Sequence, residues 1–165
     1  MKKSVSIRFR YFIALLIVIG LFSFSAFLEF HEHISPCPLC LMQRYMFAGM
    51  GIIFFIGMLL PLNKIIQGFL ALGSLVFAVG GMFFSARQSW LQHIQTNPSG
   101  NCGMSLPVLF KIFSPWQALQ QVWQGGIECS EQGWQFLHLS LADWSLIGFL
   151  LFFIFIITQI RNVFK

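Results

Sequence analysis

Four long apolar runs, separated by polar segments, set the pattern of this sequence. They cover residues 11–28, 45–63, 65–86 and 144–160, and none of them contains a charged residue. At about 1.5 Å per residue, a helix of roughly 18 residues is about 27 Å long, close to the thickness of the hydrocarbon core of a bilayer. The pattern therefore predicts an all-α membrane protein with a bundle of four transmembrane helices.

The polar segments between the runs differ in length. A short outer segment covers residues 29–44, and the second run ends in Pro61-Leu62-Asn63-Lys64, which predicts a tight turn before the third helix. Residues 87–143 form a much longer segment that is rich in turn-forming residues. We expect this segment to be a long loop on one side of the membrane. No linker or internal repeat divides the chain, so residues 1–165 are expected to form one domain.

Large apolar side chains recur every three or four residues within this long loop, as they do in amphipathic helices. Two interpretations are open. The side chains could belong to short helices that lie on the membrane surface, or to a small folded unit that buries them against itself. They are Leu106, Leu109, Phe110, Phe113, Trp116, Leu119 and Trp123.

The composition agrees with a membrane protein and argues against a nucleic-acid-binding protein. Apolar residues make up 57% of the chain and charged residues only 9%, well below the roughly 25% charged residues of an average soluble domain. The formal net charge is +5. Because the basic residues are scattered singly near the ends of the apolar runs, they indicate membrane orientation and no nucleic-acid surface.

Four spans place both termini on the same side of the membrane. If that side is the cytoplasm, the basic residues divide seven to three in its favour, which agrees with the positive-inside rule. The same orientation places all four cysteines on or near the outer side. A cleaved signal peptide is the alternative for the first run, although the run is longer than the usual apolar region of about 7–15 residues. The cytoplasmic set is Lys2, Lys3, Arg8, Arg10, Lys64, Arg161 and Lys165, and the outer set is Arg44, Arg87 and Lys111.

A Cys-x-x-Cys motif, Cys37-Pro38-Leu39-Cys40, stands just before the second apolar run. Pro38 fixes its own φ and disfavours a helical conformation for Cys37, which predicts a helix that begins at Pro38 with Cys37 at its cap. The free N–H groups and the dipole at that end favour a thiolate at Cys40. Arg44 lies four residues further along the same helical face and is expected to add positive charge beside Cys40.

Two structural uses of the motif need to be weighed against a redox use. A zinc site would need a second close pair of ligands, whereas Cys102 and Cys129 lie far apart in the sequence. A purely structural disulfide across a three-residue step closes almost no chain and contributes little stabilisation. A redox-active pair is therefore the favoured interpretation. Its position at a membrane boundary suggests a lipid-soluble electron acceptor such as a quinone.

Four cysteines allow three disulfide pairings, and the sequence alone does not choose among them. Cys37 and Cys40 are close enough to pair locally. That pairing would leave Cys102 and Cys129 to close a loop across the long outer segment.

The four spans, the Cys-x-x-Cys-x-x-x-Arg pattern at residues 37–44 and the Cys102 and Cys129 pair before the fourth span resemble the DsbB family of bacterial inner-membrane disulfide oxidoreductases. The resemblance covers nearly the whole chain and implies cytoplasmic termini and periplasmic cysteines. Family members also carry a Gln followed five residues later by His, and residues 88–93 resemble that segment. His93 is therefore a candidate near the quinone. Gln43 stands where some relatives have an acidic residue, so no carboxylate role is expected there.

The resemblance implies a relay of two disulfides. A reduced, thioredoxin-like partner of the DsbA type would attack the Cys102–Cys129 disulfide at Cys102. Cys129 would then attack Cys37 and leave Cys40 as a thiolate that faces ubiquinone or menaquinone, with Arg44 stabilising the charge. The implied function is reoxidation of a periplasmic DsbA-like oxidase, with the electrons passed to membrane quinone, in support of disulfide formation in exported proteins.

Three alternatives remain open at this point. A non-catalytic membrane subunit would use its disulfides only to brace the outer loop. A DsbB paralogue could serve one specialised DsbA-like partner. A haem-bearing quinol anchor would need histidine ligands that face one another within the spans, whereas the histidines of this chain lie outside the apolar runs, at His31, His33, His93 and His138.

Overall fold

A computed structural model describes residues 2–32, 37–60, 63–94, 106–125, 129 and 135–164. Four long helices form its main body: α1 (Lys2–Glu32), α2 (Pro38–Leu59), α3 (Lys64–Ile94) and α7 (Leu141–Phe164). Each contains a stretch that is long and apolar enough to cross a membrane. The chain is therefore a helical, multi-pass membrane protein, as the pattern of apolar runs predicts.

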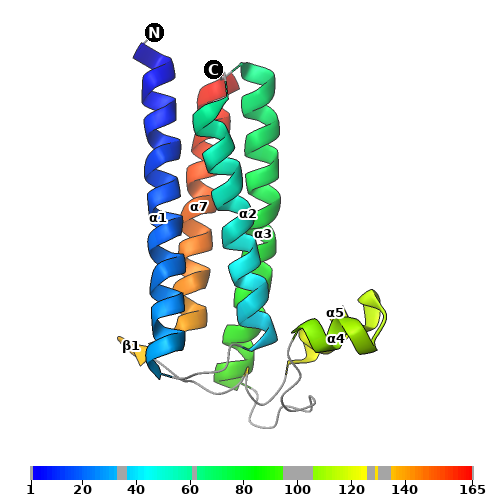
Figure 1. The fold of residues 1–165 in the computed structure, drawn as a ribbon. Coiled ribbons are helices and arrows are strands. Elements are labelled where there is room, and N and C mark those ends of the chain that lie inside the picture. The colour runs from blue at the N-terminus through cyan, green and yellow to red at the C-terminus, as the bar shows by residue number, and fades with distance from the viewer. Residues whose placement is uncertain are drawn as a thin grey trace.

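The four long helices run alongside one another in a bundle (Figure 1). Both chain ends lie at one end of this bundle, and α4, α5 and β1 lie at the other. Helix α3 packs against α2 and α7, and α1 packs against α2. Aromatic side chains dominate the core inside the bundle, where Phe47 of α2 stacks on Phe149 of α7 with ring centroids 3.9 Å apart. Helix α1 contributes Tyr11, Ala14 and Val18 to this core.

The helices do not end where the apolar runs end. Helices α1, α3 and α7 extend beyond their runs in both directions, while α2 begins at Pro38 and ends at Leu59. Helix α3 has 31 residues and is about 46 Å long, which exceeds the roughly 30 Å of a bilayer core. Its last two turns carry several polar side chains, and they can stay helical outside a bilayer because a helix satisfies its backbone hydrogen bonds internally. These turns bring Gln88, Ser89 and His93 to the end of the bundle that carries the cysteines.

Two short helices, α4 (Leu106–Ile112) and α5 (Pro115–Gln124), lie between the third and fourth long helices in the sequence. Ser114 and Pro115 start α5 as its N-cap and first residue. One face of the pair packs on the bundle and the other face is exposed, so self-burial accounts for only part of the predicted amphipathic pattern. Leu106, Leu109, Ala118 and Val122 are buried, and the exposed residues are Phe110, Trp116, Leu119 and Trp123.

A β-hairpin leads into the fourth long helix, and each of its two strands has only two residues. The apolar pattern of the sequence did not predict it. Strand β1 (Gln135–Phe136) pairs with β2 (Leu139–Ser140) in an antiparallel register. Leu137 and His138 between them have positive φ angles of 56° and 62°. The indole Nε1 of Trp144 donates a hydrogen bond to the Phe136 carbonyl oxygen at 3.2 Å. The hairpin thereby holds Phe136 against the first turn of α7.

Candidate functional site

The Cys37 and Cys40 pair lies at the N-terminus of α2. The helix begins at Pro38 with Cys37 as its N-cap, which confirms the start that the sequence predicted. The Cys37 Sγ accepts a hydrogen bond from the Cys40 backbone N–H at 3.2 Å, and the two Sγ atoms are 2.8 Å apart. A disulfide bond is about 2.05 Å long, so these two thiols can bond after a small movement.

Cys129 joins this pair from the long segment between α3 and α7. Its side chain is fully buried and is in hydrogen-bond contact with the Cys37 side chain. Gly125 makes this approach possible, because it ends α5 with a φ of 71° and packs so closely that a Cβ there would lie 2.5 Å from Leu91 Cδ1. The structure thus brings Cys37, Cys40 and Cys129 together. Cys102 lies outside the described residues.

The thiol of Cys37 is held in its neutral form. Hydrogen bonds with the Cys129 and Cys40 side chains, followed by burial, raise the pKa of Cys37 well above its usual range. Only 3% of its surface is exposed. A thiol with a raised pKa is a poor leaving group. When a Cys37–Cys40 disulfide is opened, Cys37 is therefore better suited to be attacked than to leave.

Cys40 has a partner that the sequence reasoning did not assign. The Gln88 side chain, which extends from α3 and is 3% exposed, donates from Nε2 to Cys40 Sγ at 3.0 Å and to Cys37 Sγ at 3.5 Å. A glutamine can donate two N–H groups, one to each sulfur. The only signal for Gln88 in the sequence was its place in the segment at residues 88–93.

A chain of hydrogen bonds continues from Gln88 into the bundle. Gln43 of α2 donates from Nε2 to Gln88 Oε1 at 2.7 Å, and Ser145 of α7 donates from its hydroxyl to Gln43 Oε1 at 2.6 Å. The Ser85 and Ser145 hydroxyl oxygens are 3.2 Å apart. Three helices therefore contribute to one polar path that ends at Cys40.

The charge of Arg44 acts on Cys40, as its spacing in the sequence suggested, but the hydrogen bonds of Arg44 go to α1. Its guanidinium forms an ion pair with Glu29 of α1 and donates to Ser25 Oγ at 3.0 Å and to the Ser25 carbonyl oxygen at 3.2 Å. The reason is that α1 packs beside α2 and supplies these acceptors, which the local spacing around Arg44 could not reveal. Arg44 and Cys40 still line the same cavity.

This cavity has a volume of about 520 Å³ and opens between α1, α2, α3 and α7. Its walls are mostly apolar, with a few polar groups placed near Cys40 and Arg44, which is typical of sites for small organic ligands. The lining residues from α1 and α2 are Leu21, Phe22, Phe24, Ser25, Cys40, Gln43, Arg44 and Phe47; those from α3, the hairpin and α7 are Gln88, Phe136, Leu141, Ala142, Trp144 and Ser145.

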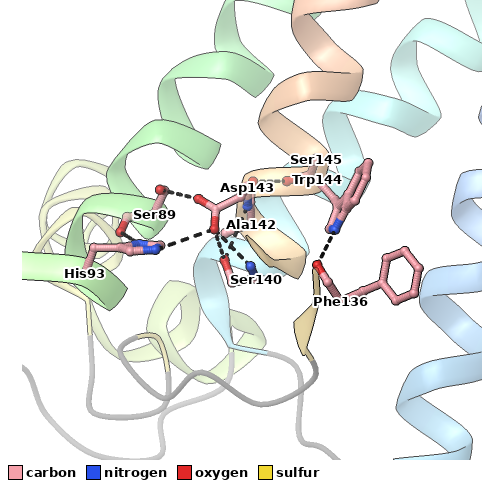
Figure 2. A network of polar contacts seen from close by, with 8 residues as sticks. All are labelled: Ser89, His93, Phe136, Ser140, Ala142, Asp143, Trp144 and Ser145. Carbon is pink, nitrogen blue, oxygen red and sulfur yellow. Dashed lines mark hydrogen bonds and ion pairs between the residues drawn. The ribbon is translucent and has the colours of Figure 1, made fainter. Parts of the chain in front are cut away.

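His93 does not line the cavity but belongs to a polar network with Ser89 and Asp143 (Figure 2). Its Nδ1 is 2.9 Å from the Ser89 carbonyl oxygen, and its Nε2 is 3.8 Å from Asp143 Oδ2. Asp143 also accepts hydrogen bonds from the Ser89 hydroxyl and from the backbone N–H and hydroxyl of Ser140. This network ties the end of α3 to the start of α7, whose first residues form one wall of the cavity.

The arrangement can carry out thiol–disulfide exchange along a row of three sulfurs. Cys129 contacts Cys37, Cys37 contacts Cys40, and Cys40 opens into the cavity. The stabilising donor, Gln88, lies closest to the sulfur at the cavity end. The geometry therefore gives the row a direction, from the buried Cys129 to the cavity.

Comparison with known proteins agrees with this geometry. Residues 7–159 match the model of a family described as disulfide bond formation protein DsbB. Among named relatives, disulfide bond formation protein B of Hahella chejuensis is 34% identical over 144 residues, covering 87% of each chain. The protein of the same name in Azoarcus is 36% identical over 131 residues, covering 79% of this chain and 78% of the relative. The one in Xylella fastidiosa is 34% identical over 132 residues, covering 79% and 76%. The chain belongs to the DsbB family of membrane proteins involved in disulfide bond formation.

Proposed function

We propose that this protein reoxidises a periplasmic DsbA-like thiol oxidase and passes the electrons to membrane quinone. The observation that carries the proposal is the row of Cys129, Cys37 and Cys40, which ends at a largely apolar cavity between the membrane-spanning helices. Such a row connects a soluble partner to a lipid-soluble acceptor. The proposed enzyme is a quinone-dependent protein-disulfide oxidoreductase of the inner membrane.

The first exchange takes place at the outer disulfide. A thiolate of the reduced partner attacks Cys102 Sγ, a mixed disulfide forms between the two proteins, and the electron pair of the broken bond leaves on Cys129. When the partner's second thiol resolves the mixed disulfide, the partner departs oxidised and Cys102 is left as a thiolate. Two electrons have then moved from the partner into this chain.

The second exchange passes these electrons to Cys40. The Cys129 thiolate attacks Cys37 Sγ of the Cys37–Cys40 disulfide, the Cys129–Cys37 bond forms, and Cys40 leaves as a thiolate. Attack at Cys37 is favoured because Cys129 contacts it and because Cys40, with its Gln88 donor and its place in the first helical turn, is the better leaving group. When the Cys102 thiolate then attacks Cys129 Sγ, Cys102–Cys129 re-forms and Cys37 is released.

The cavity has groups that suit a quinone head group. Apolar walls from Phe22, Phe47 and Trp144 would hold the ring, and Arg44, which donates three of its five N–H groups to Glu29 and Ser25, would offer a remaining one to a carbonyl oxygen. The ion pair with Glu29 and the hydrogen bonds to Ser25 repay part of the desolvation cost of holding a guanidinium at this depth. A bound quinone would supply the two-electron oxidant that restores the Cys37–Cys40 disulfide.

The energetics require an acceptor of this kind. DsbA is a strong oxidant with a potential near −120 mV, and 30 mV corresponds to about 1.4 kcal/mol for two electrons. Reoxidation of such a partner therefore needs a terminal acceptor that is more oxidising than ordinary protein disulfides. We propose ubiquinone or menaquinone, with cytoplasmic termini and periplasmic cysteines, in agreement with the distribution of basic residues.

A pair of double variants tests the direction of the relay. Cys40→Ser/Cys102→Ser retains only Cys37 and Cys129, whereas Cys37→Ser/Cys102→Ser retains only Cys40 and Cys129. After reduction and mild diamide oxidation of the purified proteins, peptide mass spectrometry should find the Cys37–Cys129 disulfide at a high yield and the Cys40–Cys129 disulfide at a much lower one. Equal yields, or a higher yield of the second, would show that Cys37 is not the sulfur that Cys129 attacks.

A further inference from the structure

The polar path that ends at Cys40 has a definite polarity. From the bundle to the sulfur, the Ser145 hydroxyl donates to Gln43 at 2.6 Å in preference to the Ala142 carbonyl oxygen at 2.9 Å, Gln43 donates to Gln88, and Gln88 donates to Cys40. Each donor is 2.6 to 3.0 Å from its acceptor. All the hydrogen bonds therefore point their positive ends toward the sulfur, and such chains polarise one another.

The same residues could also form hydrogen bonds of the opposite polarity. An amide has an oxygen and an NH₂ group of nearly the same shape, so Gln88 fits the same space when its ends are exchanged. In the exchanged state its oxygen would face the sulfurs, where it can accept a hydrogen bond from a thiol and would repel a thiolate. The orientation of Gln88 thus decides which protonation state of Cys40 is stabilised.

Gln43 decides that orientation. It is 6% exposed, and its Oε1 is occupied by the Ser145 hydroxyl, so its NH₂ group is directed at Gln88. An NH₂ group can only donate, so it requires the oxygen of Gln88 on its own side. The NH₂ group of Gln88 must then face the sulfurs.

We propose that Gln43 is a positioning residue that orients the Gln88 amide so that its N–H groups stabilise the Cys40 thiolate. The inference rests on the proposed function for its purpose, because Cys40 is the sulfur left as thiolate when Cys129 attacks Cys37. It deepens that function by assigning a role to a residue whose hydrogen bonds go to Gln88 and Ser145 and not to a sulfur. The tested property, the reactivity of Cys40, can be measured without a quinone or a partner protein.

Replacement of Gln43 by Met keeps a similar volume and removes the donor that orients Gln88. Loss of a hydrogen bond to a charged group, here the Cys40 thiolate, changes the equilibrium constant for its formation by a factor of about 10 to 150. A more basic thiolate is also more nucleophilic, which cancels about half of this effect on a logarithmic scale. We therefore expect Gln43→Met to slow the alkylation of Cys40 by iodoacetamide at pH 6 by about four- to tenfold.

The experiment uses the full-length reduced protein in detergent, and mass spectrometry of cysteine peptides reports each thiol separately. Gln67→Met is the matched control, because Gln67 is 7% exposed and lies about 31 Å further along α3 from Gln88. It should leave the rate at Cys40 unchanged. Ser145→Ala acts one link beyond Gln43 and should slow Cys40 by about twofold, so it keeps the proposal testable if Gln43→Met does not fold.

The direction of the change separates positioning from a loss of packing. A loosened structure would expose all three described cysteines and speed alkylation at Cys37 and Cys129 as well as at Cys40. The proposal instead requires a slower reaction at Cys40 alone. An unchanged or faster reaction at Cys40 in Gln43→Met would overturn it. If Cys40 slows as expected but the wild-type protein does not reduce quinone, the proposed function fails and the role of Gln43 stands.

Discussion

Replacement of Gly81 by Ala tests the packing that shapes the cavity. Gly81 of α3 faces Phe149 of α7, and a Cβ at Gly81 would lie 2.2 Å from Phe149 Cε1. Ordinary carbon contacts are about 3.5–4.0 Å, so the ring would have to move by more than 1 Å. Phe149 is fully buried and stacks on Phe47, with an angle of 17° between the rings. Because Phe47 lines the cavity, the added methyl group should distort the cavity as well as the core.

The size of the effect follows from two opposing terms. Overpacking of a core typically costs about 1–3 kcal/mol, and the change from Gly to Ala in a helix returns about 0.8–1 kcal/mol. Gly68 provides the control on the same helix, because a Cβ there would meet nothing within 4 Å. Gly68→Ala should therefore show only the gain. The two variants should differ by about 1–3 kcal/mol, with Gly81→Ala the less stable.

Thermal unfolding of the two variants in the same detergent measures this difference. For a chain of this length, 1 kcal/mol corresponds to about 2–4 °C, so the midpoint of Gly81→Ala should lie about 2–12 °C below that of Gly68→Ala. Gly81→Ala should also raise the KM for quinone, and Gly68→Ala should not. Equal midpoints and an unchanged KM would show that α3 and α7 do not pack as closely as described.

Three further predictions concern the sulfurs and their surroundings. Gln88→Leu removes the donor to Cys40 itself and should slow its alkylation at pH 6 at least as much as any change elsewhere in the polar path; a normal rate would contradict the role of Gln88. Because the pKa of Cys37 is raised, its thiolate should form only at higher pH than in the SDS-unfolded protein, so the midpoint of its pH–alkylation curve should shift upward on folding; a downward shift would contradict the contacts described. Protonated Cys37 also stabilises the folded state. This contribution should be fully present at pH values below the ordinary pKa of a thiol and should be lost as the pH rises through the raised pKa of Cys37. Asp143→Asn weakens the acceptor for the N-terminus of α7 and the ion pair with His93, at about 1–2 kcal/mol, so thermal unfolding should begin at a temperature lower by roughly 2–8 °C.

The start of α2 could be predicted from local sequence because local chemistry determines it. Pro38 restricts the residue before it and suits the first position of a helix. These rules place Cys37 at the cap without any knowledge of the other helices, and the structure confirms them. The four membrane-spanning helices could be predicted for a similar reason, since an apolar run of sufficient length has few alternatives in a bilayer.

The partners of Arg44 and Cys40 could not be predicted in the same way. Local spacing placed Arg44 beside Cys40, where its charge does act, but it could not reveal that Glu29 and Ser25 of α1 bind the guanidinium. The donor to Cys40 is Gln88, 48 residues away in the sequence. Contacts of this kind depend on which helices pack together and at what rotation, and apolar periodicity alone does not specify either.

The segment between α3 and α7 was predicted least well. Its short helices followed from apolar spacing, but the approach of Cys129 to Cys37 depends on the conformation of Gly125 and on packing against Leu91. Those are tertiary contacts with no local signature. The hairpin before α7 was missed because two-residue strands are too short to show an alternating pattern.

The most direct test of the central claim is the stoichiometry of quinone reduction by the cysteine pair. The purified protein is reduced, freed of reductant and mixed without oxygen with ubiquinone-1 or a menaquinone analogue; the loss of quinone and the formation of the Cys37–Cys40 and Cys102–Cys129 disulfides are then measured together. The account predicts one disulfide for each quinone reduced in the wild-type protein, and no quinone reduction in Cys40→Ser. Quinone reduction at the normal rate by Cys40→Ser, or formation of the disulfide without loss of quinone, would contradict it.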